Sequence, residues 1–400
     1  MRKFRILAAI AAFFLSTTLT SAPSTAADLV VPKTSFAICD TTHLTYCIES
    51  VSIQAIGGAA EPLTFTPSGT AITGIAPTVP SATPGVAGSA TLAGTWSSAT
   101  WGANGHADAG YDGIYIDAKA ANQYTNFLFV NVRPVKLDPS NIAKNSVIAA
   151  GSTNASSLNA NEAVTMKIRT GLFQSGVSIA IASSSTVTAG SDINGTNLTI
   201  TAYPTEVPVA ASTAACTGDA GVAVHKTNQL MMTFAPVNDP TSGFGVDGVS
   251  GGMSVSTNGA CLASTPVWDA ANSVLTWSVA APHFAPDGTT VNKGFYKAVI
   301  PVNDAALLWG LTDPKKAAQA LTVSVTDDNG TPSTAINSIS VKNNKILIEA
   351  SGFHYSKPTI KIKKNTKFTG FAVKKLLTCK KASSTIKFKG YVCPTGYTKG

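Results

Sequence analysis

Hydrophobic and polar residues alternate with a period of two along much of the chain, most clearly at 50–55, 164–169 and 198–202. Because successive side chains of a β-strand point to opposite faces, each of these segments predicts a strand with one buried face. The apolar runs at 321–326, 336–341 and 345–350 are separated by segments that contain Asp, Asn and Gly, which favour turns. We therefore expect these three strands to form a meander at the end of a β-sandwich. Further apolar runs predict strands at 113–118, 126–132, 229–234, 274–279, 295–299, 321–326, 336–341 and 345–350.

Helical signals are few and short. The clearest lies at 313–320, where Asp313 is a suitable N-cap, Pro314 fits the first helical position and good helix formers follow. A second short helix is expected at 304–309. Segments of this length are too short for the crossovers of a parallel sheet, which argues against an α/β fold. We therefore expect an all-β protein with one or two β-sandwich-like (immunoglobulin-like) domains and a small, disulfide-closed, basic C-terminal β module.

The N-terminus predicts export. Three basic residues among the first five precede an uncharged apolar run at 6–15, and small residues follow up to Ala27. This pattern is typical of a secretory signal peptide, and the run is too short to span a bilayer. We expect cleavage after residues 1–27 and a secreted or cell-surface location. No later apolar run reaches ~18 residues, so no transmembrane segment is expected in the mature chain.

Changes in composition divide the mature chain into three parts. A tract rich in Gly, Ala, Pro, Ser and Thr at 57–95 predicts a long loop within an N-terminal β domain at 28–205. A second β-sandwich-like domain is expected at 206–352, and a lysine-rich module at 353–400. Charged residues make up only 12% of the chain, against ~25% in a typical globular protein, so the surface of the body should be polar but sparsely charged.

Six cysteines in an exported chain predict three disulfides. A zinc site formed by Cys39, His43 and Cys47 is the alternative for the first pair. It lacks a fourth ligand nearby and does not suit an oxidising compartment, so the disulfide is the favoured interpretation. Sequence alone leaves other pairings open, but nearest neighbours along the chain favour Cys39–Cys47, Cys216–Cys261 and Cys379–Cys393.

The net charge is distributed unevenly. The formal charge of the chain is +8, yet residues 351–400 contain twelve lysines and no Asp, Glu or Arg, and the signal peptide adds three positive charges, which leaves −7 for residues 28–350. A positive potential is therefore expected at the C-terminus, where it can attract anionic cell-wall or surface polymers. The residues predicted to make this contact are Lys361, Lys363, Lys364, Lys374, Lys375, Lys380, Lys381, Lys387 and Lys389.

The lysine-rich segment also has a strand-like pattern. Lysine alternates with Ile or Phe at 359–363 and again at 385–389, which predicts two strands closed by the last disulfide. Aromatic residues are interleaved with the lysines, a composition that single-stranded nucleic acid binding also uses. Because the chain is expected to be exported, nucleic acid is not expected as the primary partner.

Short motifs in the chain resemble a group of exported proteins. Thr-Cys-Lys-Lys at 378–381, followed by Cys-Pro-x-Gly-Tyr-x-Lys at 393–399, is similar to the lysine-rich, two-cysteine C-terminal tail of certain uncharacterised exported actinobacterial proteins. Cys-Ile-Glu-Ser-Val at 47–51 resembles them as well. The resemblance implies export and a long β body before the tail. No activity is attached to that group, so the resemblance implies none here.

One catalytic motif was weighed against a structural role. Residues 248–252 match the G-x-S-x-G pattern that exposes the nucleophile of serine hydrolases on a strand–turn–helix. Asp269 and His283 follow Ser250 in the order of a catalytic triad, but the 33 positions from Ser250 to His283 leave no room for that fold. We expect a flexible loop here. The five histidines lack the spacing of a metal site, and no catalytic, cofactor or metal residue is predicted.

Two further segments invite a binding interpretation. Asp108, Asp112 and Asp117 surround two glycines and could turn around calcium, but three carboxylates fall short of the six or more oxygens that calcium prefers. A polar hairpin turn is the favoured interpretation. Trp96 and Trp101 could stack on a sugar ring, although tryptophans in small all-β domains are more often core residues.

These observations favour a non-enzymatic, exported protein of the cell envelope whose basic tail docks on anionic polymers. No cofactor is expected. A secreted hydrolase with an unrecognised site, or a carbohydrate-binding protein that uses Trp96 and Trp101, is the alternative. The enzymatic alternative remains open because sequence patterns do not reveal sites that are assembled from distant segments.

Overall fold

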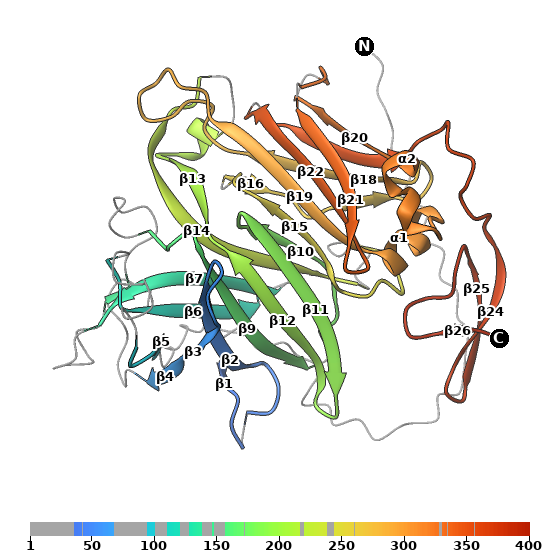
Figure 1. The fold of residues 1–400 in the computed structure, drawn as a ribbon, viewed down its shortest axis with the longest axis horizontal. Helices are drawn as coiled ribbons and strands as arrows, with labels where there is room; N and C mark the ends of the chain where they lie inside the picture. Colours follow the sequence, from blue (N-terminus) through green and yellow to red (C-terminus); the bar gives the residue numbers. More distant parts are fainter. Residues whose placement is uncertain are drawn as a thin grey trace, which may run out of the picture. The chain divides into compact units, whose positions relative to one another are not determined.

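The predicted signal peptide, at 1–27, and most of the predicted loop at 57–95 lie outside the residues that the structure describes. Residues Val31–Gly400 group into one unit, and Figure 1 shows its strands as sheets with two short helices. The computed structural model describes residues 36–41, 43–67, 94–100, 110–120, 128–137, 146–147, 157–171, 173–216, 220–237, 244–259, 261–327, 330–333, 335–355 and 357–400.

A twelve-stranded sheet runs through the described residues. Its strands are antiparallel neighbours except for the parallel pair β10–β15. Strand β13 (Thr205–Ala210) pairs with β14, and β8 (Ser146–Val147) pairs with β7. The other ten follow in the order β21 (Ile336–Lys342), β22 (Lys345–His354), β19 (Lys293–Pro301), β15 (Met253–Thr257), β10 (Ser175–Ile181), β14 (Ala223–Pro236), β7 (Leu128–Lys136), β6 (Gly113–Ala120), β5 (Gly94–Ser97) and β4 (Thr64–Pro67).

Three smaller sheets complete the described fold, which is all-β as predicted. The six-stranded sheet contains β1 (Ala37–Ile38), β2 (Cys47–Ala55), β9 (Glu162–Gly171), β12 (Gly195–Tyr203) and β11 (Ser184–Asp192), with β3 (Glu61–Pro62) on β2. The five-stranded sheet contains β16 (Leu262–Ala263), β18 (Val274–Ala280), β23 (Thr359–Lys364) and β20 (Leu321–Thr326), with β17 (Val267–Asp269) on β18. The C-terminal sheet has the order β25 (Ser384–Gly390), β24 (Lys375–Lys381) and β26 (Thr398–Lys399).

The period-two alternation in the sequence corresponds to burial in the structure. In β2, β9 and β12 the apolar positions are buried while the polar positions between them are mostly partly or fully exposed. One core lies between the six-stranded sheet and the large sheet, and it includes Val51, Met166, Leu198, Val130, Met232 and Phe234. A second core lies between the five-stranded sheet and the large sheet, and it includes Trp277, Ile362, Val255, Ala298, Ile348 and Leu308.

The two cores lie on opposite faces of the large sheet. In β10, Val177 belongs to the second core and Ala180 to the first, and strand positions separated by three residues point to opposite faces. Every residue of β10 and of β15 is buried. The middle of the large sheet is therefore covered on both sides, by β11 and β12 on one face and by the five-stranded sheet on the other.

Small hydroxyl side chains line the contact between β15 and β11. Ser254 Oγ donates a hydrogen bond to the carbonyl oxygen of Ser185 at 3.0 Å, and the hydroxyls of Ser185 and Ser256 are 2.8 Å apart. All three side chains are buried. Because a buried hydroxyl without a partner is costly, these bonds make the serines compatible with the interior and allow the two strands to pack closely.

Both predicted helices are present. Helix α1 (Val302–Trp309) ends at Gly310, which adopts the left-handed conformation with φ of 74°, as expected of a helix C-terminus. The second begins as a 3₁₀ turn, η6 (Pro314–Lys316), and continues as α2 (Ala317–Ala320). The Asp313 side chain accepts the backbone N–H of Lys315 at 3.2 Å, which confirms the predicted N-cap. A further 3₁₀ turn, η5 (Thr213–Cys216), precedes β14.

Two predictions about local organisation need correction. Residues 57–95 are not loop throughout, because β3, β4 and part of β5 lie within this range. The predicted meander is wrong: β21 and β22 form a hairpin in the large sheet, whereas β20 pairs with β23 in the five-stranded sheet. Strand β20 buries Leu321 and Val325 in the second core from the five-stranded sheet. It could not do so if it continued the β21–β22 hairpin within the large sheet.

The strand arrangement also crosses the predicted domain boundaries. Strands β4–β7 and β10, before residue 205, share the large sheet with β14, β15, β19, β21 and β22. Strand β23, from the predicted tail module, lies between β18 and β20 in the five-stranded sheet. The two lysine-rich strands of the tail, β23 and β25, therefore belong to different sheets, and only residues from Lys375 onward form a sheet of their own.

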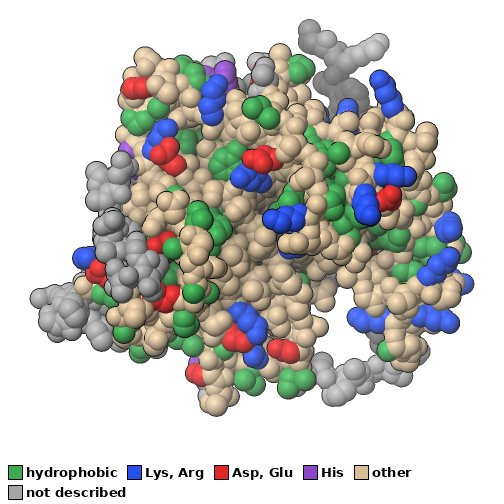
Figure 2. Space-filling view, in the orientation of Figure 1, with side chains coloured by type: hydrophobic (Ala, Val, Ile, Leu, Met, Phe, Trp, Pro, Cys, Tyr) green, Lys and Arg blue, Asp and Glu red, His purple; other side chains and the backbone are tan. Residues whose placement is uncertain are grey.

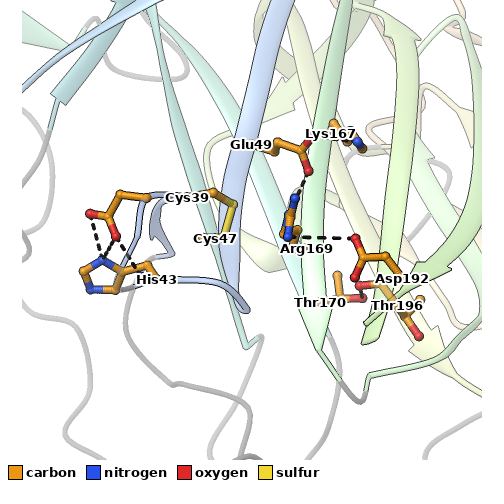
Figure 3. The surroundings of a disulfide bond; sticks show 10 residues. Cys39, His43, Cys47, Glu49, Lys167, Arg169, Thr170, Asp192 and Thr196 are labelled. Atoms are coloured by element: carbon orange, nitrogen blue, oxygen red, sulfur yellow. Dashed lines mark hydrogen bonds and ion pairs between the residues drawn. A yellow bond between two sulfur atoms is a disulfide. The ribbon is translucent and has the colours of Figure 1, made fainter. Parts of the chain in front are cut away.

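The six cysteines form the three predicted disulfides, Cys39–Cys47, Cys216–Cys261 and Cys379–Cys393. Figure 3 shows the first of them beside β2. The zinc alternative is wrong, because both sulfurs are bonded to each other. The imidazole of His43 instead lies 3.1 Å from a carboxylate oxygen of Asp40.

Exchange of Ser254 for Val should destabilise the whole protein. The substitution removes the donor to the Ser185 carbonyl and places a larger apolar group in a closely packed contact, so we expect the free energy of unfolding to fall by about 1–3 kcal/mol. Denaturant titration measures it. The control is Ser338→Val on the exposed strand β21, which should change stability by less than about 0.5 kcal/mol. Equal effects of the two variants would contradict a close contact between β15 and β11.

Candidate functional site

The C-terminal sheet separates its lysines onto two faces. In the β24–β25 hairpin, Thr378 lies opposite Lys387, Leu376 opposite Lys389, and Lys380 opposite Thr385. Residues directly opposite each other share a face, and so do alternate residues of one strand. The outer face, defined as Leu376, Thr378, Lys380, Thr385, Lys387, Lys389 and Thr398, therefore carries three lysines among threonines.

The opposite face of the same hairpin is apolar at its centre. Leu377 and Cys379 are buried, and their partners Phe388 and Ile386 are half-buried. Lys375 lies at one end of this inner face, and Lys399 lies opposite Cys379. The alternation of Lys with Ile, Phe, Leu and Cys thus produces one basic face and one face that can pack.

The lysines of the outer face are exposed and lack carboxylate partners among the described residues. Lys380, Lys387 and Lys389 are all exposed, and Lys387 Nζ donates a hydrogen bond to Thr378 Oγ1 at 2.7 Å. Residues 351–400 contain no acidic residue that could neutralise them. Figure 2 shows basic side chains gathered over β24–β26 at the right of the view.

Several cations of the body, in contrast, form ion pairs. Lys167 Nζ and Arg169 Nε bind the two carboxylate oxygens of Glu49 at 2.6 and 2.8 Å, and Arg169 also lies 3.8 Å from Asp192 (Figure 3). Partial burial raises the pKa of Glu49, but the hydrogen bonds from Lys167 and Arg169 outweigh it and hold this pKa below its usual range. Glu49 therefore neutralises the charges of Lys167 and Arg169 within the fold. The outer-face lysines have no such carboxylate partner among the described residues.

The remaining predicted lysines lie elsewhere. Lys361 and Lys363 are exposed on β23, on the face of the five-stranded sheet opposite the buried Ile360 and Ile362. Lys364 donates a hydrogen bond from Nζ to the Tyr391 hydroxyl at 3.0 Å and also lies over the Phe371 ring. The structure therefore does not gather all nine predicted lysines into one surface. Of the other predicted lysines, Lys374 lies over the Tyr391 ring, Lys381 lies over the Tyr397 ring, and Lys375 lies on the inner face.

Backbone hydrogen bonds attach the C-terminal sheet to the body on two sides. The N–H of Ala372 donates to Gly310, at the end of α1, at 2.8 Å. The N–H of Thr395 donates to the carbonyl oxygen of Gly248 at 2.9 Å. Gly248 has φ of 83°, and a Cβ at this position would lie 2.4 Å from Pro394, so only glycine allows this approach.

The G-x-S-x-G segment serves this attachment. Ser250 donates its backbone N–H and its hydroxyl to the two carboxylate oxygens of Asp304, each at 2.8 Å. Asp304 lies in the first turn of α1 and is fully buried. Burial raises the pKa of Asp304 to about 6, against the opposing effect of the two bonds from Ser250. The segment thus joins α1 to the turn that holds Pro394 and Thr395.

Asp269 and His283 have other partners. The Asp269 carboxylate accepts hydrogen bonds from the backbone N–H groups of Ala271 and Asn272, both at 3.0 Å. The His283 ring lies 3.2 Å from the carbonyl oxygen of Tyr355 and packs against Phe284. The Ser250 hydroxyl donates to Asp304 and accepts the backbone N–H of Gly252. A triad of Ser250, Asp269 and His283 therefore has no support in these contacts.

The sugar and calcium candidates lie only partly in the described residues. Trp96 is 5% exposed and packs against Phe65 at a ring distance of 5.3 Å, so its ring is a core group and is not presented for stacking. Asp112 binds Lys136 Nζ at 2.9 Å, which supports the hairpin-turn interpretation. Trp101 and Asp108 lie outside the described residues.

A cavity that sequence reasoning missed lies between α1 and the C-terminal sheet. Its volume is about 390 Å³, and Asn303 and Ala306 of α1 line one side. Lys375, Leu377 and Lys399 of the sheet, together with the segment 391–397, line the other. No local pattern could reveal this cavity, since its walls come from segments about 70 residues or more apart in the chain.

No protein-family model, curated protein or solved structure matches the chain. No helix in the described part of the chain has the length and apolar character needed to cross a bilayer. Among these same residues, no group of three or more His, Cys, Asp or Glu side chains is arranged to hold a metal ion.

The stability of the protein should depend on the ionisation of Asp304. Its pKa in the folded chain, about 6, exceeds the ordinary value of 3.8, so folding favours the protonated form. The stabilising contribution is complete below pH ~4 and is lost as the pH rises through ~6. Relative to Asp304→Asn, the free energy of unfolding of the unchanged protein should therefore fall by roughly 3 kcal/mol from pH ~4 to pH ~7.

Denaturant titrations at several pH values measure this difference. Asp287→Asn is the control, because hydrogen bonds from Thr290 and Thr289 lower the pKa of this exposed carboxylate to about 2, and the trend with pH should have the opposite sign. A difference between Asp304→Asn and the unchanged protein that is independent of pH would contradict a raised pKa at this position.

Removal of the last disulfide should loosen the C-terminal sheet and spare the body. The bond between Cys379 and Cys393 closes a loop of 15 residues, which stabilises the sheet by roughly 3 kcal/mol in the loop-entropy model. In the Cys379→Ser, Cys393→Ser variant, amide hydrogen exchange should accelerate in β24–β26 and not in β9. The same double exchange at Cys39 and Cys47 should leave β24–β26 unchanged. Acceleration throughout the body would show that the sheet is required for the whole fold.

Proposed function

We propose that this protein is an exported, non-enzymatic component of the cell envelope that docks on anionic polymers through the outer face of its C-terminal sheet. The observation that supports it most directly is the set of three exposed lysines, Lys380, Lys387 and Lys389, on one face without a carboxylate partner among the described residues. They belong to a stretch of 50 residues with twelve positive charges and no negative ones.

The geometry of the outer face suits a linear polyanion. Lys387 and Lys389 lie two positions apart on β25, which corresponds to roughly 7 Å along the strand. Lys380 belongs to the neighbouring strand, and threonine hydroxyls between the lysines can donate hydrogen bonds. A lysine ammonium is a compact point charge, so such a face provides attraction and retention without fine selection among anions.

The body is consistent with this location. Three disulfides favour an oxidising compartment outside the cytoplasm, as the predicted signal peptide does. The all-β body carries the C-terminal sheet on two attachment points and adds Lys361 and Lys363 on an exposed sheet face. The immunoglobulin-like character of the sandwiches stays a prediction, and the proposal does not depend on it.

Neither alternative is favoured by a specific contact. A hydrolase stays possible in principle, but the one catalytic motif of the sequence is occupied by the Ser250–Asp304 pair. Sugar binding through Trp96 is disfavoured by the burial of its ring. Nucleic acid remains an unsuitable primary partner for a protein that we propose to be exported.

Exchange of the outer-face lysines tests the proposal. In the full mature chain, the triple variant Lys380→Gln, Lys387→Gln, Lys389→Gln should bind isolated cell walls and immobilised poly(glycerol phosphate) roughly tenfold more weakly at low salt. Retention of the unchanged protein should be lost near ~1 M salt, where the Debye length falls to ~3 Å. Substitution is preferable to truncation at Gly352, which would remove β23 from the five-stranded sheet.

The matched control exchanges three exposed lysines on other elements, Lys293, Lys315 and Lys342, for Gln. It removes the same net charge from the body. If both triple variants lose the same affinity, net charge alone accounts for binding and the outer face has no special part in it. Retention that is indifferent to salt would also exclude the docking role.

A further inference from the structure

The cavity between α1 and the C-terminal sheet has the chemistry of a binding site. Its volume of about 390 Å³ falls within the range of roughly 300–1,000 Å³ that is typical of small-molecule sites. The residues that line it include two lysines, Lys375 and Lys399, together with Asn303 and the aromatic residues Tyr391 and Tyr397. This combination differs from the purely basic outer face.

The two lysines lie at different positions along the C-terminal sheet. Lys399 pairs with Cys379, and Lys375 lies four residues before Cys379 on the same face of β24. At ~3.3 Å per residue, the two Cα positions are separated by roughly 13 Å along the strand direction. A single small anion would engage one of them, whereas a ligand with anionic groups on successive units would engage both.

The aromatic residues favour a ring-bearing ligand over a simple polyanion. A tyrosine ring offers an apolar face for packing against the C–H groups of a sugar, and its hydroxyl offers a polar edge. Tyr391 is held in position by Lys364, which donates to its hydroxyl at 3.0 Å and lies over its ring, and by Lys374, which also lies over the ring. Tyr397 follows a turn in which its N–H donates to Pro394 at 3.0 Å.

The wall formed by 391–397 is held in place before any ligand binds. The Cys379–Cys393 disulfide ties it to β24, and the hydrogen bond from Thr395 to Gly248 ties it to the loop that Asp304 anchors. Asn303, immediately before Asp304, is exposed at the start of α1 and lines the cavity. A wall that is ordered in advance reduces the entropy that binding must otherwise overcome.

We propose that this cavity binds a short acidic saccharide, two or more sugar rings with carboxylate or phosphate groups, through Lys375, Lys399 and the rings of Tyr391 and Tyr397. This inference rests on the proposed function and refines it. The outer face would attract anionic polymers in general, and the cavity would select those built from acidic sugars.

Calorimetric titration of the full mature chain tests the cavity by itself. The probes are tetragalacturonate, a phosphorylated maltotetraose, neutral maltotetraose and a glycerol phosphate tetramer. Saturable binding is expected for either or both of the acidic saccharides, and the stronger of the two identifies the carboxylate or the phosphate as the preferred group. Neutral maltotetraose and the ring-free glycerol phosphate tetramer should bind at least about tenfold more weakly.

Variants separate the cavity from the outer face. Lys375→Gln and Lys399→Gln should each weaken binding of the preferred saccharide roughly tenfold, and Ala306→Leu, which fills the cavity from α1, should abolish it. Lys367→Gln, an exposed lysine outside the cavity, is the charge-matched control and should have no effect. Hydrogen exchange of β24–β26 shows whether each variant retains the fold of the sheet.

The two proposals fail in different ways. If the unchanged protein binds none of the acidic saccharides, or if Lys367→Gln weakens binding as much as Lys375→Gln does, the cavity has no selective role, even where cell-wall retention through the outer face persists. If the saccharides bind and retention on poly(glycerol phosphate) is unaffected by the outer-face triple variant, the cavity stands and the outer-face proposal fails.

Discussion

The fold depends on two strands, β10 and β15, that are covered on both faces. Other strands of the large sheet can leave one face exposed to solvent. Strands β10 and β15 must place apolar residues toward the five-stranded sheet and small residues toward β11. Ser254 and Ser256 meet Ser185 across that contact, and their mutual hydrogen bonds make burial of the hydroxyls tolerable. Because the sheet is shared, each core is closed by strands from both halves of the chain, which explains why no sheet boundary falls at residue 205.

Asp304, a buried carboxylate of α1, supports one of the two attachments that join the C-terminal sheet to this framework. Asp304 holds the 248–252 loop through two bonds from Ser250, and that loop receives the turn at Pro394 and Thr395. The two glycines of this G-x-S-x-G segment are required by the backbone. Gly248 allows the close approach of Pro394, and Gly251, with φ of 78°, lies against the carbonyl oxygen of Ser175. Pro394 and Thr395, which this loop holds, line the cavity beside α1.

Charged side chains are arranged differently in the body and in the C-terminal sheet. Glu49 joins Lys167 and Arg169 across neighbouring strands of the body, so these charges are largely satisfied within the fold. The C-terminal sheet has no acidic residue in its sequence, and its alternation directs some lysines outward and others toward the cavity. The proposed general attraction and the proposed selection would then come from opposite faces of one small hairpin, because each face receives every second residue.

The sequence by itself determined the strand character, the short helices and the nearest-neighbour disulfides, because alternation, capping and loop closure are local properties. It did not reveal β10, in which Val177, Ile179 and Ile181 alternate with the small residues Ser178 and Ala180; every position is buried, so no charged or exposed face marks the strand. It also placed β23 in the tail, since the pairing of Ile360 and Ile362 with distant strands leaves no local signal. Of the candidate site, strand β25 and the disulfide beside it could be foreseen, whereas the pairing of β25 with β24 and the cavity could not. Only the tertiary structure brings Asn303 and Ala306 opposite Lys375 and Lys399, because packing in three dimensions, and not proximity along the chain, decides which segments share a wall.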